Sequence, residues 1–194
     1  MPNSITGKGA TEADELALLA RVRRGNREAF CELYQRYHPR LYGYLRRQLS
    51  DPGTVEEVLD DVMLVVWKDA RKFRGDAAVS SWIFGIAYRK AMTAMRTERC
   101  YQAPLDRSAN ADAVAAVSSQ HDELIPVALM RLSPDHRQVV ELTYFSGFSY
   151  QEIAEIVGCP VNTVKTRMFH ARRRLRVLLP ALAGQAKEQD RERA

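Results

Sequence analysis

The sequence predicts an all-α protein of two small helical domains joined by a flexible linker, with a helix-turn-helix in the C-terminal domain. Helix-start signals recur along the chain, whereas the alternation of apolar and polar residues that marks strands is almost absent. Residues 100–122 are rich in Ala, Ser, Asp and Asn and show little periodicity, which is typical of a linker. The 194 residues, 46% hydrophobic and 27% charged, suit one domain of about 150 residues or two small ones.

Composition also excludes other classes of protein. No apolar run approaches the roughly 18 residues of a membrane-spanning helix, and the N-terminus lacks the apolar centre of a secretory signal. A cytoplasmic protein is therefore expected. Cys31, Cys100 and Cys159 are far apart and odd in number. This spacing indicates packing residues in a reducing compartment, with thiol sensing as the alternative. It suits neither a metal site nor a disulfide framework.

The first domain is expected to span residues 11–99, after a disordered N-terminus of residues 1–10. A pattern at Thr11 resembles a capping box that opens a short helix. The apolar side of that helix is Leu16, Leu19 and Ala20. Asn26 can cap a second helix, in which Pro39 predicts a kink and not an end, because the apolar stripe keeps its phase across it.

Two further helices complete the predicted first domain. After a turn at residues 51–53, a capping box of Thr54 and Glu57 opens a helix that runs to about Lys72. A loop over residues 73–79 follows, and Ser80 or Ser81 can cap a helix that ends near Arg99.

The second domain is expected to span residues 123–182, followed by a solvated tail of residues 183–194. Ser133 followed by Pro134 predicts the start of a helix that ends at Gly147. A capping box at Ser149 opens a short helix, which Gly158 stops. A last helix from about Pro160 to Leu179 is expected to close at Pro180.

The two helices on either side of Gly158 have the spacing of a helix-turn-helix. Ala154 is small where the helices must cross, and a glycine suits the tight turn. The last helix divides by periodicity into two sides. Its apolar stripe is Val164, Met168, Ala171 and Leu175, and its opposite side carries Asn162, Lys165, Thr166, Phe169 and Arg173.

That opposite side suits the major groove of DNA. Lys165 and Asn162 can hydrogen-bond base edges, Thr166 permits close approach, and Arg173 can reach phosphate. Between residues 160 and 179 the chain has six Lys or Arg residues and no acid. A solvated basic helix, favoured by its own dipole, is the structural alternative. The turn and the exposed aromatic residue favour DNA binding.

The predicted helix over residues 54–72 has a second candidate surface. Its core stripe is Val55, Val58, Leu59, Val62 and Val66. The opposite side carries Glu57, Asp60, Asp61, Leu64 and Lys68, next to Trp67. A solvated acidic face would explain the charges alone. A protein-docking face also explains the leucine and the tryptophan, since interfaces combine apolar anchors with charged rims.

Four blocks of the sequence, taken in order, resemble the small two-domain extracytoplasmic-function (ECF) group of bacterial sigma factors. The blocks are AFCELYQRYHPRLYGYL, EEVLDDVMLVVWKDARKF, FRGDAAVSSWIFGIAYRKAMTAMR and LSPDHRQVVELTYFSGFSYQEIAEIVGCPVNTVKTRMFHARRRL. The resemblance covers about residues 12–180. It implies a non-catalytic protein that joins core RNA polymerase, places it at promoters and helps to open the DNA. The domains 11–99 and 123–182 would correspond to sigma regions 2 and 4.

The resemblance also implies residue roles. Core polymerase would be bound through its clamp helices by Asp60, Asp61, Leu64, Trp67 and Lys68, with Asp60 standing where many relatives have glutamine. The C-terminal domain would lie on the polymerase flap. The minus-35 element would be read by Asn162, Lys165, Thr166, Phe169, His170 and Arg173, with His170 standing where relatives often have arginine.

The minus-10 element would be read by the loop from Arg74 to Ser80 and by the helix after it. A base extruded from the duplex needs an apolar wall and polar groups for its edge. Phe73 and Ile86 are candidates for that wall, and Asp76, Ser80 and Arg89 for the polar contacts. Arg74 and Lys90 complete the expected set, and Arg89 stands where many relatives have asparagine.

The sequence shows no catalytic constellation. The histidines are scattered, there is no HExxH motif or phosphate-binding loop, and His136 is interpreted as a surface residue. No enzyme activity, cofactor, metal or small-molecule substrate is expected. The resemblance further implies an anti-sigma partner, often membrane-attached, that masks the surfaces for DNA and core polymerase.

Two alternatives remain open on the sequence. A stand-alone dimeric helix-turn-helix regulator would bind a palindromic site tightly without polymerase. An adaptor that acts independently of nucleic acid would tolerate the double substitution Lys165→Ala and Thr166→Ala.

Overall fold

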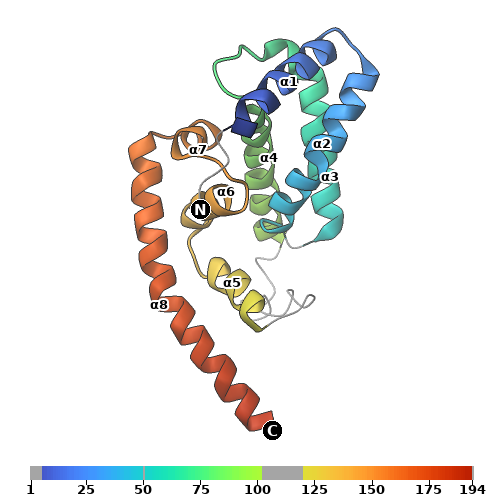
Figure 1. The fold of residues 1–194 in the computed structure, drawn as a ribbon. Coiled ribbons are helices and arrows are strands. Elements are labelled where there is room, and N and C mark those ends of the chain that lie inside the picture. Colours follow the sequence, from blue (N-terminus) through green and yellow to red (C-terminus); the bar gives the residue numbers. More distant parts are fainter. Residues whose placement is uncertain (1–5, 50, 102–119, 194) are drawn as a thin grey trace. The chain divides into compact units, whose positions relative to one another are not determined.

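The computed structural model describes residues 6–49, 51–101 and 120–193 (Figure 1). Every regular element in these ranges is helical, so the predicted all-α class is confirmed. Contacts divide the chain into two compact units, residues 1–101 with 155–158 and residues 102–154 with 159–194. Most of the predicted linker lies outside the described residues; α4 ends at Tyr101 and α5 begins at Gln120.

Helices α1 (Thr6–Arg23) and α2 (Arg27–Arg46) open the first unit. Asn26 caps α2 as predicted, because its Oδ1 accepts a hydrogen bond from the Ala29 N–H at 2.8 Å. Pro39 lies inside α2 without ending it. The predicted helix is present and Leu19 of its apolar side is buried, but its predicted start was wrong, because Thr11 lies within α1 and does not cap it. Leu16 is exposed.

Helix α3 (Pro52–Asp69) begins two residues before the predicted start. Its N-cap is Asp51, whose Oδ2 accepts hydrogen bonds from the Thr54 N–H at 2.7 Å and the Thr54 hydroxyl at 2.8 Å. The expected turn at residues 51–53 is therefore the first turn of the helix, because Pro52 is preorganised for the first helical position. A 3₁₀ turn, η1 (Ala70–Lys72), follows.

Helix α4 (Val79–Tyr101) completes the first unit. It begins at Val79, so the serines expected to cap it lie inside its first turn. Buried side chains from α2, α3 and α4 form the core of this unit. Among the fully buried ones are Leu33, Tyr37, Leu41, Tyr44, Leu59, Met63, Ile83 and Phe84. The guanidinium of Arg40 lies over the rings of Tyr37 and Phe84 at 5.3 and 5.4 Å, and it lies 4.0 Å from the buried carboxylate of Glu15.

The second unit contains α5 (Gln120–Met130), α6 (Pro134–Tyr144), the first part of α7 (Tyr150–Val157) and α8 (Val161–Arg193). Ser133 caps α6 as predicted, accepting from the His136 N–H at 3.4 Å. The capping box at Ser149 is also confirmed. The Ser149 N–H donates to Glu152 Oε2 at 2.8 Å, and the Glu152 N–H donates to Ser149 Oγ at 3.3 Å.

Helix α8 does not close at Pro180, as the sequence analysis expected, but continues to Arg193. Proline removes the hydrogen bond to the carbonyl four residues earlier, that of Arg176. Because Arg176 is exposed, water can satisfy that carbonyl. The residues after Pro180, rich in Ala, Gln, Glu, Lys and Arg, favour a helix over the expected irregular tail.

One cysteine differs from the expectation of a packing residue. Cys31 is an exposed free thiol and Cys159 a half-buried one. Cys31 lies on the polar side of α2, because the helical repeat places it outside the buried stripe that includes Ala29 and Leu33. The side chain of Cys100 lies outside the described residues.

The cap at Asp51 predicts a pH-dependent contribution to stability. Hydrogen bonds from Thr54, first from its N–H and then from its hydroxyl, lower the pKa of Asp51 below its usual 3.8. The contribution is therefore present above pH 3.8 and lost as the pH falls through the lowered value. We expect Asp51→Ala to lower the free energy of unfolding in urea at about pH 7, and to have less effect at about pH 2. An equal loss of stability at both pH values would show that the ionised carboxylate of Asp51 does not cause the effect.

Candidate functional site

The turn between α7 and α8 fixes the course of α8. Gly158 has a positive φ of 73°, a conformation that glycine adopts without strain. The Cys159 N–H donates to the Ala154 carbonyl at 3.0 Å, which closes the end of α7. The Thr163 N–H then donates to the Pro160 carbonyl at 2.9 Å at the start of α8. These contacts form the tight turn that the sequence predicts.

Helix α8 has two distinct sides over its first four turns. Val164, Met168 and Ala171 are buried, and Leu175 is half-buried. The six predicted minus-35 residues are all exposed: Asn162, Lys165, Thr166, Phe169, His170 and Arg173. Phe169 leaves 63% of its surface uncovered, which no packing role explains. The exposed side of α8 is therefore available for a partner.

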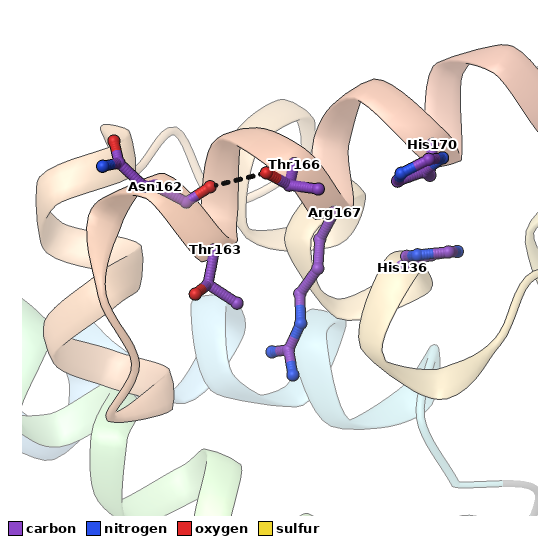
Figure 2. Close-up of a pocket in the computed structure, with 6 residues that line it drawn as sticks. All are labelled: His136, Asn162, Thr163, Thr166, Arg167 and His170. Carbon is purple, nitrogen blue, oxygen red and sulfur yellow. Dashed lines mark hydrogen bonds between the residues drawn. The ribbon is translucent and has the colours of Figure 1, made fainter.

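A shallow groove borders this exposed side (Figure 2). It is lined by His136 from α6 and by Asn162, Thr163, Thr166, Arg167 and His170 from α8. The rings of His136 and His170 stack, with centroids 6.0 Å apart and planes 22° from parallel. The Thr166 hydroxyl donates to the Asn162 carbonyl at 2.9 Å, so it is held within the helix.

Two arginines of α8 are held by other helices. Arg167 forms an ion pair of 2.6 Å with Asp135 of α6. Arg172 donates to the hydroxyl groups of Tyr144 and Tyr150 at 3.1 and 3.4 Å. A count of basic residues in the sequence does not distinguish these two arginines from the other arginines of α8. Their partners depend on tertiary packing, so no signal in the sequence identifies them, and the same holds for His136.

The outward side of α3 carries the predicted core-binding residues. Asp60, Asp61, Leu64 and Lys68 are exposed, Leu64 by 47%, whereas Val55, Leu59, Val62 and Val66 are buried on the opposite side. Trp67 is half-buried and packs edge-on against Phe30 with ring centroids 5.0 Å apart. We call Asp60, Asp61, Leu64, Trp67 and Lys68 the α3 face.

Both aspartates of the α3 face have partners on neighbouring helices. The Tyr34 hydroxyl of α2 donates to Asp60 Oδ1 at 3.1 Å. Burial, and secondly this hydrogen bond, raise the pKa of Tyr34, so the phenol stays a donor. Lys90 Nζ of α4 lies 2.7 Å from Asp61 Oδ2. The structure thus pairs a predicted core-binding residue with a predicted minus-10 residue.

The other predicted minus-10 residues divide into exposed and buried groups. Arg74, Asp76 and Arg89 are exposed, and Ser80 is half-buried. Phe73 and Ile86, the candidates for the apolar wall, are 7% and 5% exposed. Phe73 packs against Trp82 with ring centroids 5.3 Å apart, and Ile86 follows the buried Ile83 by one helical turn. Their contact with an extruded base stays a prediction.

The described part of the chain holds no group of three or more His, Cys, Asp or Glu side chains arranged to bind a metal ion. Among its helices, none combines the length and apolar character needed to cross a membrane.

Comparison with protein families matches both halves of the chain. Residues 33–100 match the family model of sigma-70 region 2. Residues 122–175 match that of sigma-70 region 4. The first match includes the α3 face and the predicted minus-10 residues, and the second includes the exposed side of α8.

The chain is also similar over most of its length to two relatives that are both named ECF RNA polymerase sigma factor SigK. The chain is 31% identical over 188 residues to the ECF RNA polymerase sigma factor SigK of Mycobacterium ulcerans, covering 91% of this chain and all of the relative. It is 32% identical over 183 residues to SigK of Mycobacterium tuberculosis H37Rv, covering 89% of this chain and 97% of the relative.

Two solved structures share the fold. One contains the sigma factor RpoE in complex with the anti-sigma factor NepR, from Bartonella quintana. The similarity to it has a TM-score of 0.66 at 27% identity and covers 78% of this chain and 96% of that one. The other contains CnrH in complex with the cytosolic domain of CnrY, with a TM-score of 0.65, 25% identity, and coverage of 85% and 96%.

The ion pair between Asp135 and Arg167 predicts a gain in DNA affinity when it is broken. In Asp135→Asn, Arg167 loses its carboxylate partner and can add one cation to the exposed side of α8. We expect the salt dependence of duplex binding to steepen by about 0.9 in log–log slope. Fluorescence anisotropy of the full chain on a labelled duplex measures this slope. Asp14→Asn, an exposed change on α1, is the control; an unchanged slope in Asp135→Asn would show that Arg167 does not reach DNA.

Proposed function

The chain belongs to the ECF group of RNA polymerase sigma factors, and on this premise we propose which surfaces perform that role. The α3 face binds core RNA polymerase, α4 with the loop before it contacts the minus-10 element, and the exposed side of α8 contacts the minus-35 element. The observation that carries the proposal is the presence, in one chain, of an acidic face around an exposed leucine and a basic face around an exposed phenylalanine. The matches to both sigma regions favour this role over a stand-alone dimeric regulator.

The α3 face has the composition of a protein interface. Leu64 supplies an exposed apolar anchor, and the aspartates around it supply a charged rim. Trp67 is held by Phe30, so little conformational freedom is lost when a partner covers it. The acids favour a basic partner surface, which by family resemblance is the clamp helices of the largest polymerase subunit.

The exposed side of α8 has the chemistry for the major groove. Asn162 and Lys165 can donate to base edges, Phe169 can contact a thymine methyl group, and Arg173 can reach a phosphate. His170 and Thr166 complete this surface. By the same resemblance, the region 4-like domain, proposed as residues 123–182, lies on the polymerase flap.

Contacts with the minus-10 element are assigned to the region 2-like domain, proposed as residues 11–99. Arg74, Asp76 and Arg89 are exposed and can meet bases or phosphates. Lys90 can do so once its ion pair with Asp61 opens. A base pocket walled by Phe73 and Ile86 would require these buried side chains to be uncovered, with Ser80 at its edge.

An anti-sigma factor, soluble or membrane-attached, is the proposed regulator. The similar RpoE is bound to one in its solved structure. Leu64 and Phe169 are exposed apolar side chains on the two proposed binding surfaces, so a protein that covers them would block both polymerase and DNA. We further propose that the chain acts in the cytoplasm, where polymerase and chromosome lie, and that it catalyses no reaction of its own.

The α3 face yields a test of polymerase binding. We expect Asp61→Arg to weaken binding to core polymerase by at least tenfold, because it reverses one charge of the rim and places a second cation beside Lys90. Binding is measured by competition for labelled core, and helicity by circular dichroism. Asp14→Arg is the matched charge reversal on α1 and is expected to bind normally. Normal binding by a folded Asp61→Arg would refute the assigned face.

The exposed side of α8 yields a test of promoter recognition. We expect Lys165→Ala with Thr166→Ala to abolish the preference of the holoenzyme for DNA with an intact minus-35 element over DNA with a scrambled one. The reason is that each lost base contact removes about 1–3 kcal/mol of discrimination. Core binding should be unchanged. A retained preference would show that Lys165 and Thr166 do not read the minus-35 element.

A further inference from the structure

The stacked imidazoles of His136 and His170 connect α6 to the proposed DNA-binding side of α8. His170 is exposed, whereas His136 is half-buried near the start of α6 (Figure 2). The Ser133 hydroxyl oxygen accepts a hydrogen bond from the His136 N–H at 3.4 Å, which places His136 in the capped first turn of α6. The ring of His136 therefore rests on a fixed backbone and can support the ring of His170.

A second contact also orients His170. The ring of Phe169, its neighbour in the chain, meets it edge-on with centroids 5.4 Å apart and planes 77° from parallel. His170 thus has one aromatic ring against its face and another across its edge. Its orientation is set by two contacts, one within α8 and one from α6.

The charges around the pair are mostly positive. Both imidazoles line two hollows, one bordered by Arg167 and the other by Arg131, Arg173 and Arg174. Arg167 is paired with Asp135, the acid of α6 beside the pair. The remaining cations make the surface around both imidazoles attractive to the negatively charged DNA backbone.

We propose that His136 is a positioning residue for DNA recognition, holding His170 by stacking so that protonated His170 presents one additional cation to the DNA backbone. This inference rests on the proposed function of α8 and extends it to a residue of α6. The proposal places the proton on His170 alone, because two imidazolium ions at this distance would repel each other. An aromatic ring beneath a cation is a favourable contact, so the ring of His136 can support a charged His170.

The sign of the pH dependence follows from linkage. If DNA favours the protonated form of His170, then protonation favours DNA by the same factor. Promoter affinity therefore rises as the pH falls from about 8 to about 6, the range in which histidine titrates. One charge-assisted contact predicts a gain of roughly fivefold, and one added cation steepens the log–log salt slope by about 0.9.

The experiment measures promoter affinity of reconstituted holoenzyme at about pH 6 and about pH 8, over a range of salt concentrations. The probe is a labelled promoter fragment recovered from the transcription starts of the same holoenzyme. Four variants are compared with the wild type: His136→Ala, His136→Phe, His170→Gln and, as a control on α2, His38→Ala. Titration of other groups in the polymerase is common to all and is removed by comparison with His170→Gln.

The proposal predicts a specific pattern. The wild type, His38→Ala and His136→Phe gain roughly fivefold in affinity at the lower pH relative to His170→Gln, because the phenyl ring preserves the stack. His136→Ala keeps its helicity but loses most of that gain and the added salt slope. A purely structural role for His136 would instead lower affinity equally at both pH values.

Three outcomes would overturn the proposal. An unchanged pH gain in His136→Ala would show that His136 does not position His170. Loss of the gain in His136→Phe would show that stacking is not the cause. Equal pH profiles of wild type and His170→Gln would show that His170 carries no proton to DNA. Failure of the proposed function itself is distinct, since the holoenzyme would then yield no transcription starts from which to take the probe.

Discussion

The buried stripe of α3 decides which side chains of the first unit can meet a partner. With Val55, Leu59, Val62 and Val66 in the core, the helical repeat turns Asp60, Asp61 and Leu64 outward. The same constraint acts in α8, where burial of one stripe exposes the opposite side over four turns. Because each proposed face follows from the packing behind it, residues on the face can be substituted while the buried stripe that holds the helix is kept.

Contacts between helices then modify the charge that each face presents. Asp60 accepts a hydrogen bond from Tyr34, Asp61 is paired with Lys90, and Arg167 is paired with Asp135. Exposed ion pairs contribute about 0–1 kcal/mol, so a partner with better geometry can replace them at small cost. The Asp61–Lys90 pair joins the proposed polymerase surface to the proposed DNA surface. On the proposed assignment, polymerase contact at Asp61 and phosphate contact at Lys90 both require this pair to open.

Sequence reasoning succeeded where the signal lies within a few residues. Asn26, Ser133 and Ser149 cap their helices as predicted, because a cap bonds to an N–H only three residues away. The amphipathic split of α8 follows from periodicity in the same way. The family and its two regions were also identified, because four motifs occur in the right order.

The failures have physical causes of their own. Thr11 and Thr54 match a capping pattern that also occurs inside helices, and Asp51 followed by Pro52 is the stronger start for α3. The resemblance assigns Phe73 and Ile86 to an apolar wall but carries no information on exposure, so the burial of both side chains could not be predicted from it. The contacts of Arg167 and His136 depend on how α6 packs against α8, which no local pattern encodes.

The central claim, that this chain directs RNA polymerase to promoters, is tested most directly by run-off transcription on fragmented genomic DNA with purified core polymerase. Discrete starts that appear only when the protein is added are the predicted result. No new starts, together with tight and salt-sensitive binding of the free protein to duplex DNA, would contradict the account.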